Sequence, residues 1–176
     1  MLELFINFNK CMLYDFTKKF GEAISFLESS DISSPNKPVI PHALRVGKYL
    51  FEKGMDNQIV NAGLLHDMLE WSSVVESEVE EKFGKRVLEL IKANTKDRNI
   101  EDKNKRMIDK IERCKQVGDD ALAIKIADTL DSFYYYSEIK SEEEIDRCRR
   151  WTKLLIDNLS VNSQKVFLQE LNEMIK

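Results

Sequence analysis

Cysteine is scarce in this sequence, and its distribution excludes a disulfide-stabilised scaffold. The 176 residues contain three cysteines, Cys11, Cys114 and Cys148, which are far apart and form no CxxC pair. Small secreted domains that depend on disulfides contain many more cysteines for their length. We therefore expect the three thiols to be reduced, in the core or on the surface.

Glycine and proline are also scarce, which favours helical structure. The chain has six glycines, and its three prolines all lie between residues 35 and 41. Both residue types interrupt helices, so the chain can be helical almost everywhere outside this segment. Residues 29–41, SSDISSPNKPVIP, form the clearest irregular loop, and Pro41 suits the first turn of the helix that follows.

Long hydrophobic runs and an excess of basic residues are lacking as well. No apolar run approaches the length of a membrane span, and the first one is too short, and acidic at Glu3, for a signal peptide. The 27 basic residues are balanced by 31 acidic ones, and the net charge of −4 argues against nucleic-acid binding. We expect a soluble, cytoplasmic protein that binds neither membranes nor nucleic acid.

What the sequence does contain is helical periodicity with recurrent capping signals. Asp56 can cap a helix, and Ser77 with Glu80 and Ser141 with Glu144 match capping boxes. No alternating pattern is long enough to indicate a strand. The sequence predicts an all-α protein in which residues 1–176 form one domain of about eight to ten helices. The predicted helices span residues 42–53, 56–71, 77–83, 86–94, 101–116, 121–136, 141–159 and 162–175.

Two histidines and two aspartates form the candidate reactive centre. His42 and His66 are the only histidines, Asp67 follows the second at once, and Asp128 lies in the apolar run ALAIKIADTL. Such a mixed nitrogen and oxygen set suits a divalent transition metal such as manganese, iron or zinc. Taken singly, a histidine can cap a helix, and Asp128 can pair with Lys125. Because unpaired charges are costly in an apolar helix, the set as a whole favours a shared metal.

The order of these residues, H…HD…D, resembles that of the HD-domain metal-dependent phosphohydrolases. The resemblance is closer to one branch, the hydrolase domains of RelA/SpoT-type (p)ppGpp enzymes and the small alarmone hydrolases. It rests on a proline before His42 and on the segments HDMLEW, EVEEKFGKRVLELIKANTK, AIKIAD and RCRRWTKLLIDNL, and it covers about residues 35–160. It implies a single helical domain that hydrolyses a phosphorylated nucleotide.

The resemblance also implies a role for each motif residue. It makes His42, His66, Asp67 and Asp128 the ligands of a divalent metal, which is usually Mn²⁺ in this branch. Glu70 matches the first acidic residue of the family's HDxxED motif, which orients or activates the attacking water. Since Glu70 lies four residues after His66, it would share that helix face, although a solvated carboxylate at the helix end is the alternative.

Four basic residues are candidates for binding the substrate phosphates. Lys125 matches the lysine of the family's VKLAD motif and lies three residues before Asp128, although a simple ion pair is the alternative. The others are Arg45, Lys96 and Arg106, for which a solvated surface charge is the alternative. The aromatic run from Phe133 to Tyr136 is better explained by core packing than by stacking on a base.

The chain departs from the family pattern at four places, which leaves the substrate open. Trp71 replaces the second acid of HDxxED, Ser132 replaces an asparagine, Cys148 replaces a late tyrosine, and ISSPNK replaces an Arg-Ser-Gly-type segment. Three hypotheses follow: a ppGpp 3′-pyrophosphohydrolase, an HD phosphohydrolase for another nucleotide or phosphoester, and a metal- or nucleotide-binding protein with little turnover. A small phosphorylated nucleotide is the expected partner, and a homodimer is compatible with each hypothesis.

Overall fold

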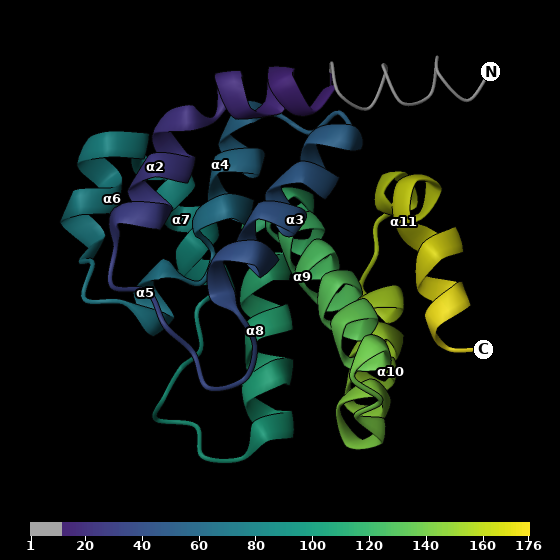
Figure 1. Ribbon diagram of the computed structural model, residues 1–176. Coiled ribbons are helices and arrows are strands. Elements are labelled where there is room, and N and C mark those ends of the chain that lie inside the picture. Colours follow the sequence, from purple (N-terminus) through teal and green to yellow (C-terminus); the bar gives the residue numbers. More distant parts are fainter. Residues whose placement is uncertain (1–11) are drawn as a thin grey trace.

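The computed structural model describes residues 12–176, and this part of the chain consists of helices and connecting loops without a strand (Figure 1). The predicted all-α fold class is confirmed. Residues 12–19 are helical, and Cys11 lies outside the described residues. The helices that follow are α2 (Gly21–Ser29), α3 (Val39–Glu52), α4 (Asn57–Leu65), α5 (Met68–Trp71), α6 (Glu76–Phe83), α7 (Lys85–Asn94), α8 (Lys103–Val117), α9 (Asp119–Glu138), α10 (Glu142–Asp157) and α11 (Val161–Met174).

The helix predicted over residues 56–71 is interrupted at the HD dipeptide. Helix α4 ends at Leu65 and α5 begins at Met68, so His66 and Asp67 lie in the turn between them. The His66 ring donates a hydrogen bond from Nδ1 to the Gly63 carbonyl (2.8 Å), which lies in the last turn of α4. The side chain thus caps α4 through a local contact that apolar periodicity does not reveal.

The predicted caps are confirmed only in part. Asp56 accepts a hydrogen bond from the Gln58 amide (2.8 Å) and caps α4 as expected. The predicted box at Ser77 is wrong, because α6 begins earlier and the Glu78 carboxylate accepts a hydrogen bond from the Val75 amide (2.9 Å). The box at Ser141 is also wrong, because its side chain makes no capping hydrogen bond.

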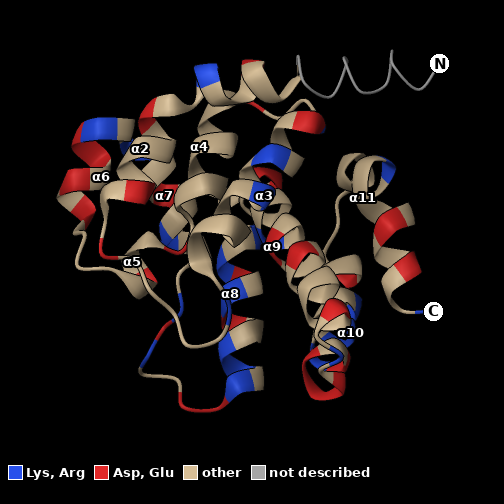
Figure 2. Ribbon diagram, in the orientation of Figure 1, with Lys and Arg blue, Asp and Glu red and all other residues tan. Residues whose placement is uncertain are grey.

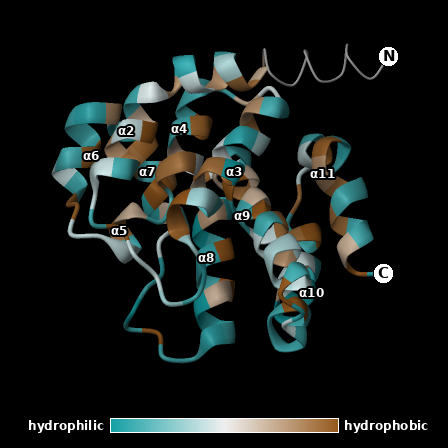
Figure 3. Ribbon diagram, viewed as in Figure 1, coloured by the Kyte–Doolittle hydropathy of each residue, from teal (hydrophilic) through white to brown (hydrophobic). Residues whose placement is uncertain are grey.

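Helix α9 is the centre of the bundle. It packs against α3, α4, α7, α8, α10 and α11, and its apolar residues, including Leu122, Ile124 and Ile126, are buried. The surrounding helices α8 and α10 are largely hydrophilic in Figure 3. No helix in the described part of the chain is long and apolar enough to cross a membrane.

Two of the three cysteines lie in the interior. Cys114 and Cys148 are free and buried, and burial raises the pKa of each thiol to about 11. Both therefore stay protonated at neutral pH and behave as small apolar side chains.

The contact between α3 and α4 depends on the absence of a side chain at Gly47. A Cβ atom at this position would lie 2.5 Å from Cγ of Leu64, which is fully buried on α4. Because α3 carries His42 and α4 ends next to His66, this close approach sets the distance between the two histidines.

We predict that Gly47→Ala destabilises the protein by about 1–3 kcal/mol, the usual range for overpacking a core, despite the better helix propensity of alanine. Urea denaturation measures the change. The matched control is Gly21→Ala, because a Cβ atom at Gly21 meets no atom within 4 Å. Equal stabilities of the two variants would show that α3 and α4 are not closely packed at Gly47.

Candidate metal centre

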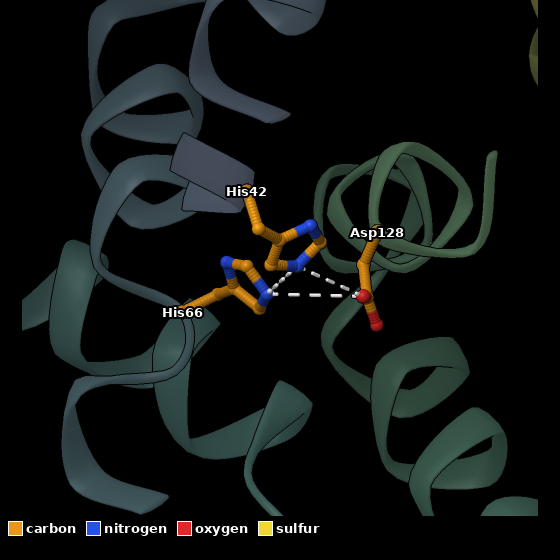
Figure 4. Close-up of side chains that lie close together, drawn as sticks. All are labelled: His42, His66 and Asp128. Atoms are coloured by element: carbon orange, nitrogen blue, oxygen red, sulfur yellow. Dashed lines mark hydrogen bonds and ion pairs between the residues drawn. The ribbon is translucent and has the colours of Figure 1, made fainter. Parts of the chain in front are cut away.

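Three side chains from two helices and one interhelical turn converge at the centre of the bundle (Figure 4). His42 lies in the first turn of α3, His66 follows α4, and Asp128 lies in the middle of α9. The Nε2 atom of His42 lies 3.3 Å from Nε2 of His66 and 3.2 Å from Oδ1 of Asp128. Both rings are buried, so bulk water cannot satisfy these atoms.

The hydrogen bonds of the two rings leave both Nε2 atoms as acceptors. His42 donates from Nδ1 to the Asp131 carboxylate (2.6 Å), and His66 donates from Nδ1 to the Gly63 carbonyl. These partners favour the tautomers that carry the ring proton on Nδ1. Two lone pairs then face each other beside a carboxylate oxygen. This donor set fits a divalent cation, which would satisfy all three groups at once.

Burial and neighbouring charges set the protonation of the cluster. Burial lowers the pKa of His66, which favours the neutral form that binds metals. Burial would also lower the pKa of His42, but the neighbouring carboxylates of Asp128 and Asp131 raise it overall. Desolvation would raise the pKa of Asp128, yet the ammonium groups of Lys125 and Lys37 hold it well below its usual range.

Asp67 lies at the edge of this cluster. Its Oδ1 atom is 3.5 Å from Nε2 of His66, and its Oδ2 atom is 3.9 Å from Nε2 of His42. All four residues that the sequence predicts as metal ligands are therefore brought together by the fold. Both distances are longer than the 3.2 Å between Oδ1 of Asp128 and Nε2 of His42. Asp67 also lines the cavity described below, and it would complete the coordination from that side.

Asp131 is a hydrogen-bond partner of the cluster that the sequence analysis did not identify. Besides its bond with His42, it accepts hydrogen bonds from Nε (2.6 Å) and a terminal nitrogen (3.0 Å) of Arg45. Its position three residues after Asp128 on α9 was the available signal, since this spacing places both on one helix face. Arg45 is half exposed and does not line the cavity described below, so in this structure it orients Asp131.

A cavity of about 310 Å³ opens beside the cluster and is strongly basic. Asp67 and Asp128 line it together with Glu70, and seven basic residues oppose these three acids. In a chain with a net charge of −4, this excess favours a small, multiply charged anion as ligand. Some of these basic residues belong to α8, a helix that carries many Lys and Arg positions (Figure 2). The seven basic residues are Lys37, Lys96, Lys103, Arg106, Lys110, Lys125 and Arg147.

The predicted catalytic residue Glu70 is buried and held by lysines. Its carboxylate accepts a hydrogen bond from the Lys96 amide (3.1 Å), forms an ion pair with the Lys96 ammonium and lies 3.8 Å from Nζ of Lys110. The Lys96 ammonium also lies over the Trp71 ring, 4.7 Å from its centre. Trp71, which replaces the second acidic residue of the HDxxED motif, is part of the cavity wall.

The other predicted phosphate-binding residues occupy different places in the cavity. Lys125 is buried, and its Nζ atom lies 2.5 Å from Oδ2 of Asp128. Arg106 lines the cavity but donates from Nε to the Ile100 carbonyl (2.7 Å), which orders the loop before α8. Lys110 also lines the cavity, although the sequence analysis did not identify it. Desolvation and the nearby charge of Lys125 lower the pKa of Lys110 to about 8.

Several lining residues lie in segments that the sequence analysis compared with the family without assigning these residues to the site. Lys37 belongs to the loop before α3, and Arg147 and Trp151 to α10. Within residues 12–176, neither Nε of Arg147 nor Nε1 of Trp151 has a hydrogen-bond partner, although both atoms are buried. Buried donors without a partner are rare in folded proteins, so these two atoms mark a place where the packing beside the cavity is not saturated.

We predict that Asp131→Ala weakens metal binding about 10–100-fold, the usual effect of removing the hydrogen-bond acceptor behind a histidine ligand. Competition with a chromogenic chelator measures the affinity. Asp146→Ala is the control, because Asp146 forms an exposed ion pair with Arg149 outside the site. An unchanged affinity in Asp131→Ala would contradict the assignment of Nε2 of His42 as a ligand atom.

Comparison with known families identifies the proteins that this chain resembles. The sequence model of the HD domain matches residues 23–155. The chain is 35% identical over 107 residues to a probable guanosine-3′,5′-bis(diphosphate) 3′-pyrophosphohydrolase of Mycoplasma pneumoniae, which covers 54% of this chain and 15% of the relative. A relative of the same printed function from Aquifex aeolicus is 34% identical over 98 residues, which cover 54% of this chain and 14% of the relative. The chain thus spans about one seventh of the length of these bacterial relatives.

Shorter relatives and solved structures match over more of their length. The pyrophosphohydrolase MESH1 of Drosophila melanogaster is 28% identical over 69% of this chain and 71% of its own. A solved metazoan ortholog of SpoT, described as hydrolysing ppGpp, superposes with a TM-score of 0.71 at 26% identity, over 89% of this chain and 93% of its own. Because the family match includes most of the chain and every residue of the candidate centre, the chain belongs to the HD-domain family.

Proposed function

We propose that this protein is a Mn²⁺-dependent phosphohydrolase that removes the 3′-pyrophosphate from ppGpp. The observation that carries the proposal is the position of the His42, His66 and Asp128 cluster beside a cavity with seven basic and three acidic residues. A cation-binding centre next to a basic wall suits hydrolysis of a phosphate ester. We also propose that the protein is cytoplasmic, and we keep the formation of a homodimer as a prediction.

The shape and chemistry of the cavity support a nucleotide with several phosphates. The basic residues come from the loop before α3, from the region between α7 and α8, and from α8, α9 and α10, so they surround the cavity. The aromatic rings of Trp71 and Trp151 are also in its wall, where they could stack on a base. The curated relatives from bacteria and Drosophila, all with this printed activity, point to the same substrate.

The four motif residues have the donor atoms to hold the metal. His42, His66, Asp67 and Asp128 would bind a divalent ion, which when bound acidifies a water molecule and polarises a phosphoryl oxygen. Lys125 would offset the charge that develops on the phosphoryl oxygens. We assign Glu70 to accept the proton of the attacking water, while Lys96 and Lys110 hold its carboxylate in position.

The overall reaction cleaves one ester bond. Oxygen from water forms a new bond to phosphorus, the bond from phosphorus to the 3′-oxygen breaks, and the proton taken up by Glu70 is returned to that oxygen. The products are GDP and pyrophosphate. Arg45 would act indirectly, because its bonds to Asp131 fix the carboxylate that orients His42.

A second candidate follows from Trp71. This residue lines the cavity where the family's second acid would stand, and it removes a carboxylate from the reaction space. An HD phosphohydrolase for another nucleotide, or a nucleotide-binding protein with little turnover, would fit this change. The substrate panel below distinguishes the three hypotheses.

We expect purified protein with Mn²⁺ to release GDP and pyrophosphate from ppGpp. The measurement is chromatographic product analysis over a panel of ppGpp, nucleoside mono- and triphosphates and dinucleotides. The His66→Ala, Asp67→Ala double variant is the control and should lose the activity, because it removes two proposed ligands. Turnover of another nucleotide alone would favour a different HD phosphohydrolase, and binding of metal without turnover would favour the binding protein.

We also expect Trp71→Asp to increase the rate of ppGpp hydrolysis. Restoring a carboxylate beside Glu70 would add a second group that orients the attacking water, so kcat should rise by about tenfold or more. Trp71→Phe is the matched control, since it keeps an apolar ring without a carboxylate. Equal rates for the wild type, Trp71→Asp and Trp71→Phe would contradict a role for this position in catalysis.

A further inference from the structure

Two departures from the family pattern meet in the structure. Lys37 belongs to the altered segment ISSPNK, and Ser132 stands where the alarmone hydrolases place an asparagine. Although 95 residues separate them in the sequence, Nζ of Lys37 donates a hydrogen bond of 2.6 Å to Oγ of Ser132. Both residues line the cavity. The changes therefore form one altered contact.

This contact is attached directly to a proposed metal ligand. Nζ of Lys37 and Oγ of Ser132 each lie 3.3 Å from Oδ1 of Asp128. The side chain of Lys37 is 12% exposed, so its ammonium group is largely withdrawn from water. A desolvated ammonium group beside the metal ligands lies within reach of a group bound at the centre.

The backbone around Lys37 holds the ammonium group in place. Pro35 lies two residues before Lys37 and Pro38 directly follows it, and a residue before proline is largely confined to extended conformations. The Pro38 carbonyl accepts a hydrogen bond from the His42 amide (3.3 Å), and the Ser33 amide donates to the Trp71 carbonyl (3.0 Å). The segment is thereby joined to both α3 and the end of α5.

With a divalent ion bound at the centre, the charges around Asp128 favour the binding of a dianion. Asp67 and Asp128 together balance the two positive charges of a divalent ion, and Asp131 balances Arg45. Lys37 and Lys125 then remain as two uncompensated ammonium groups at the same carboxylate. A phosphate group carries about the charge needed to neutralise both.

We infer that Lys37, oriented by Ser132, binds the phosphate group that is placed at the metal centre and so determines which phosphate of a substrate enters it. The inference deepens the proposed function and rests on it for the nature of the substrate. Lys37 touches the substrate in this assignment, whereas Ser132 is a positioning residue.

The two tryptophans of the chain provide a direct binding assay. Trp71 and Trp151 are the only tryptophans in the sequence, and both line the cavity. Intrinsic fluorescence can therefore follow a titration with inorganic pyrophosphate at micromolar Mn²⁺, without any turnover. Free Mn²⁺, measured by electron paramagnetic resonance, gives the metal affinity of the same samples.

We expect Lys37→Met to raise the Kd for pyrophosphate about tenfold, the loss typical of one charge-assisted hydrogen bond. The same variant should bind Mn²⁺ with equal or higher affinity, because a positive charge near the metal is removed. Lys37→Arg should retain most of the pyrophosphate affinity. Ser132→Ala should weaken pyrophosphate binding, and adding it to Lys37→Met should cause no further loss, since both act through one contact.

Lys48→Met is the matched control, because Lys48 pairs with Glu52 on the outside of α3 and its loss should change neither affinity. An unchanged Kd for pyrophosphate in Lys37→Met would overturn the inference, as would a parallel loss of Mn²⁺ affinity, which indicates a structural role. Circular dichroism verifies the fold of each variant. If pyrophosphate binding depends on Lys37 but ppGpp is not hydrolysed, the proposed function fails and the inference stands.

Discussion

The architecture of the site depends on a carboxylate placed inside the central helix. Asp128 lies in the middle of α9, where an unpaired charge would be strongly destabilising. Lys125 from the same helix, His42 from α3 and Lys37 from the preceding loop all lie within 3.3 Å of its oxygens. The site is therefore assembled when the chain folds, because the segments that pack around Asp128 on α9 also carry the polar partners of this carboxylate.

The charge distribution separates this cavity from the rest of the molecule. The chain is acidic overall, yet basic residues outnumber acidic ones around the 310 Å³ cavity. A small polyanion would be attracted to the cavity, whereas an extended nucleic acid would meet a surface of mixed charge. The burial of Glu70 between Lys96 and Lys110 extends this pattern, since two lysines surround one acid of the wall.

The sequence predicted the all-α class and the four residues of the HD motif, because helical periodicity and rare residues in a fixed order are local signals. It also predicted the buried Lys125 at Asp128, which follows from a spacing of three residues on one helix. Asp131 was missed despite the same spacing. The break between α4 and α5 was missed as well, because the apolar residues of 56–71 continue without interruption although the His66 side chain ends α4.

The sequence by itself determined which side chains are available for metal and phosphate chemistry, since composition and the order of motif residues are properties of the chain before it folds. Only the tertiary structure decided how they divide their roles. Arg45 turned to Asp131 outside the cavity, while Lys37 turned inward to Ser132 and Asp128. The physical reason is that a cation takes the partner that packing brings within hydrogen-bonding distance. For Arg45 and Lys37 that partner lies about 90 residues away in the chain, beyond the range of any local sequence signal.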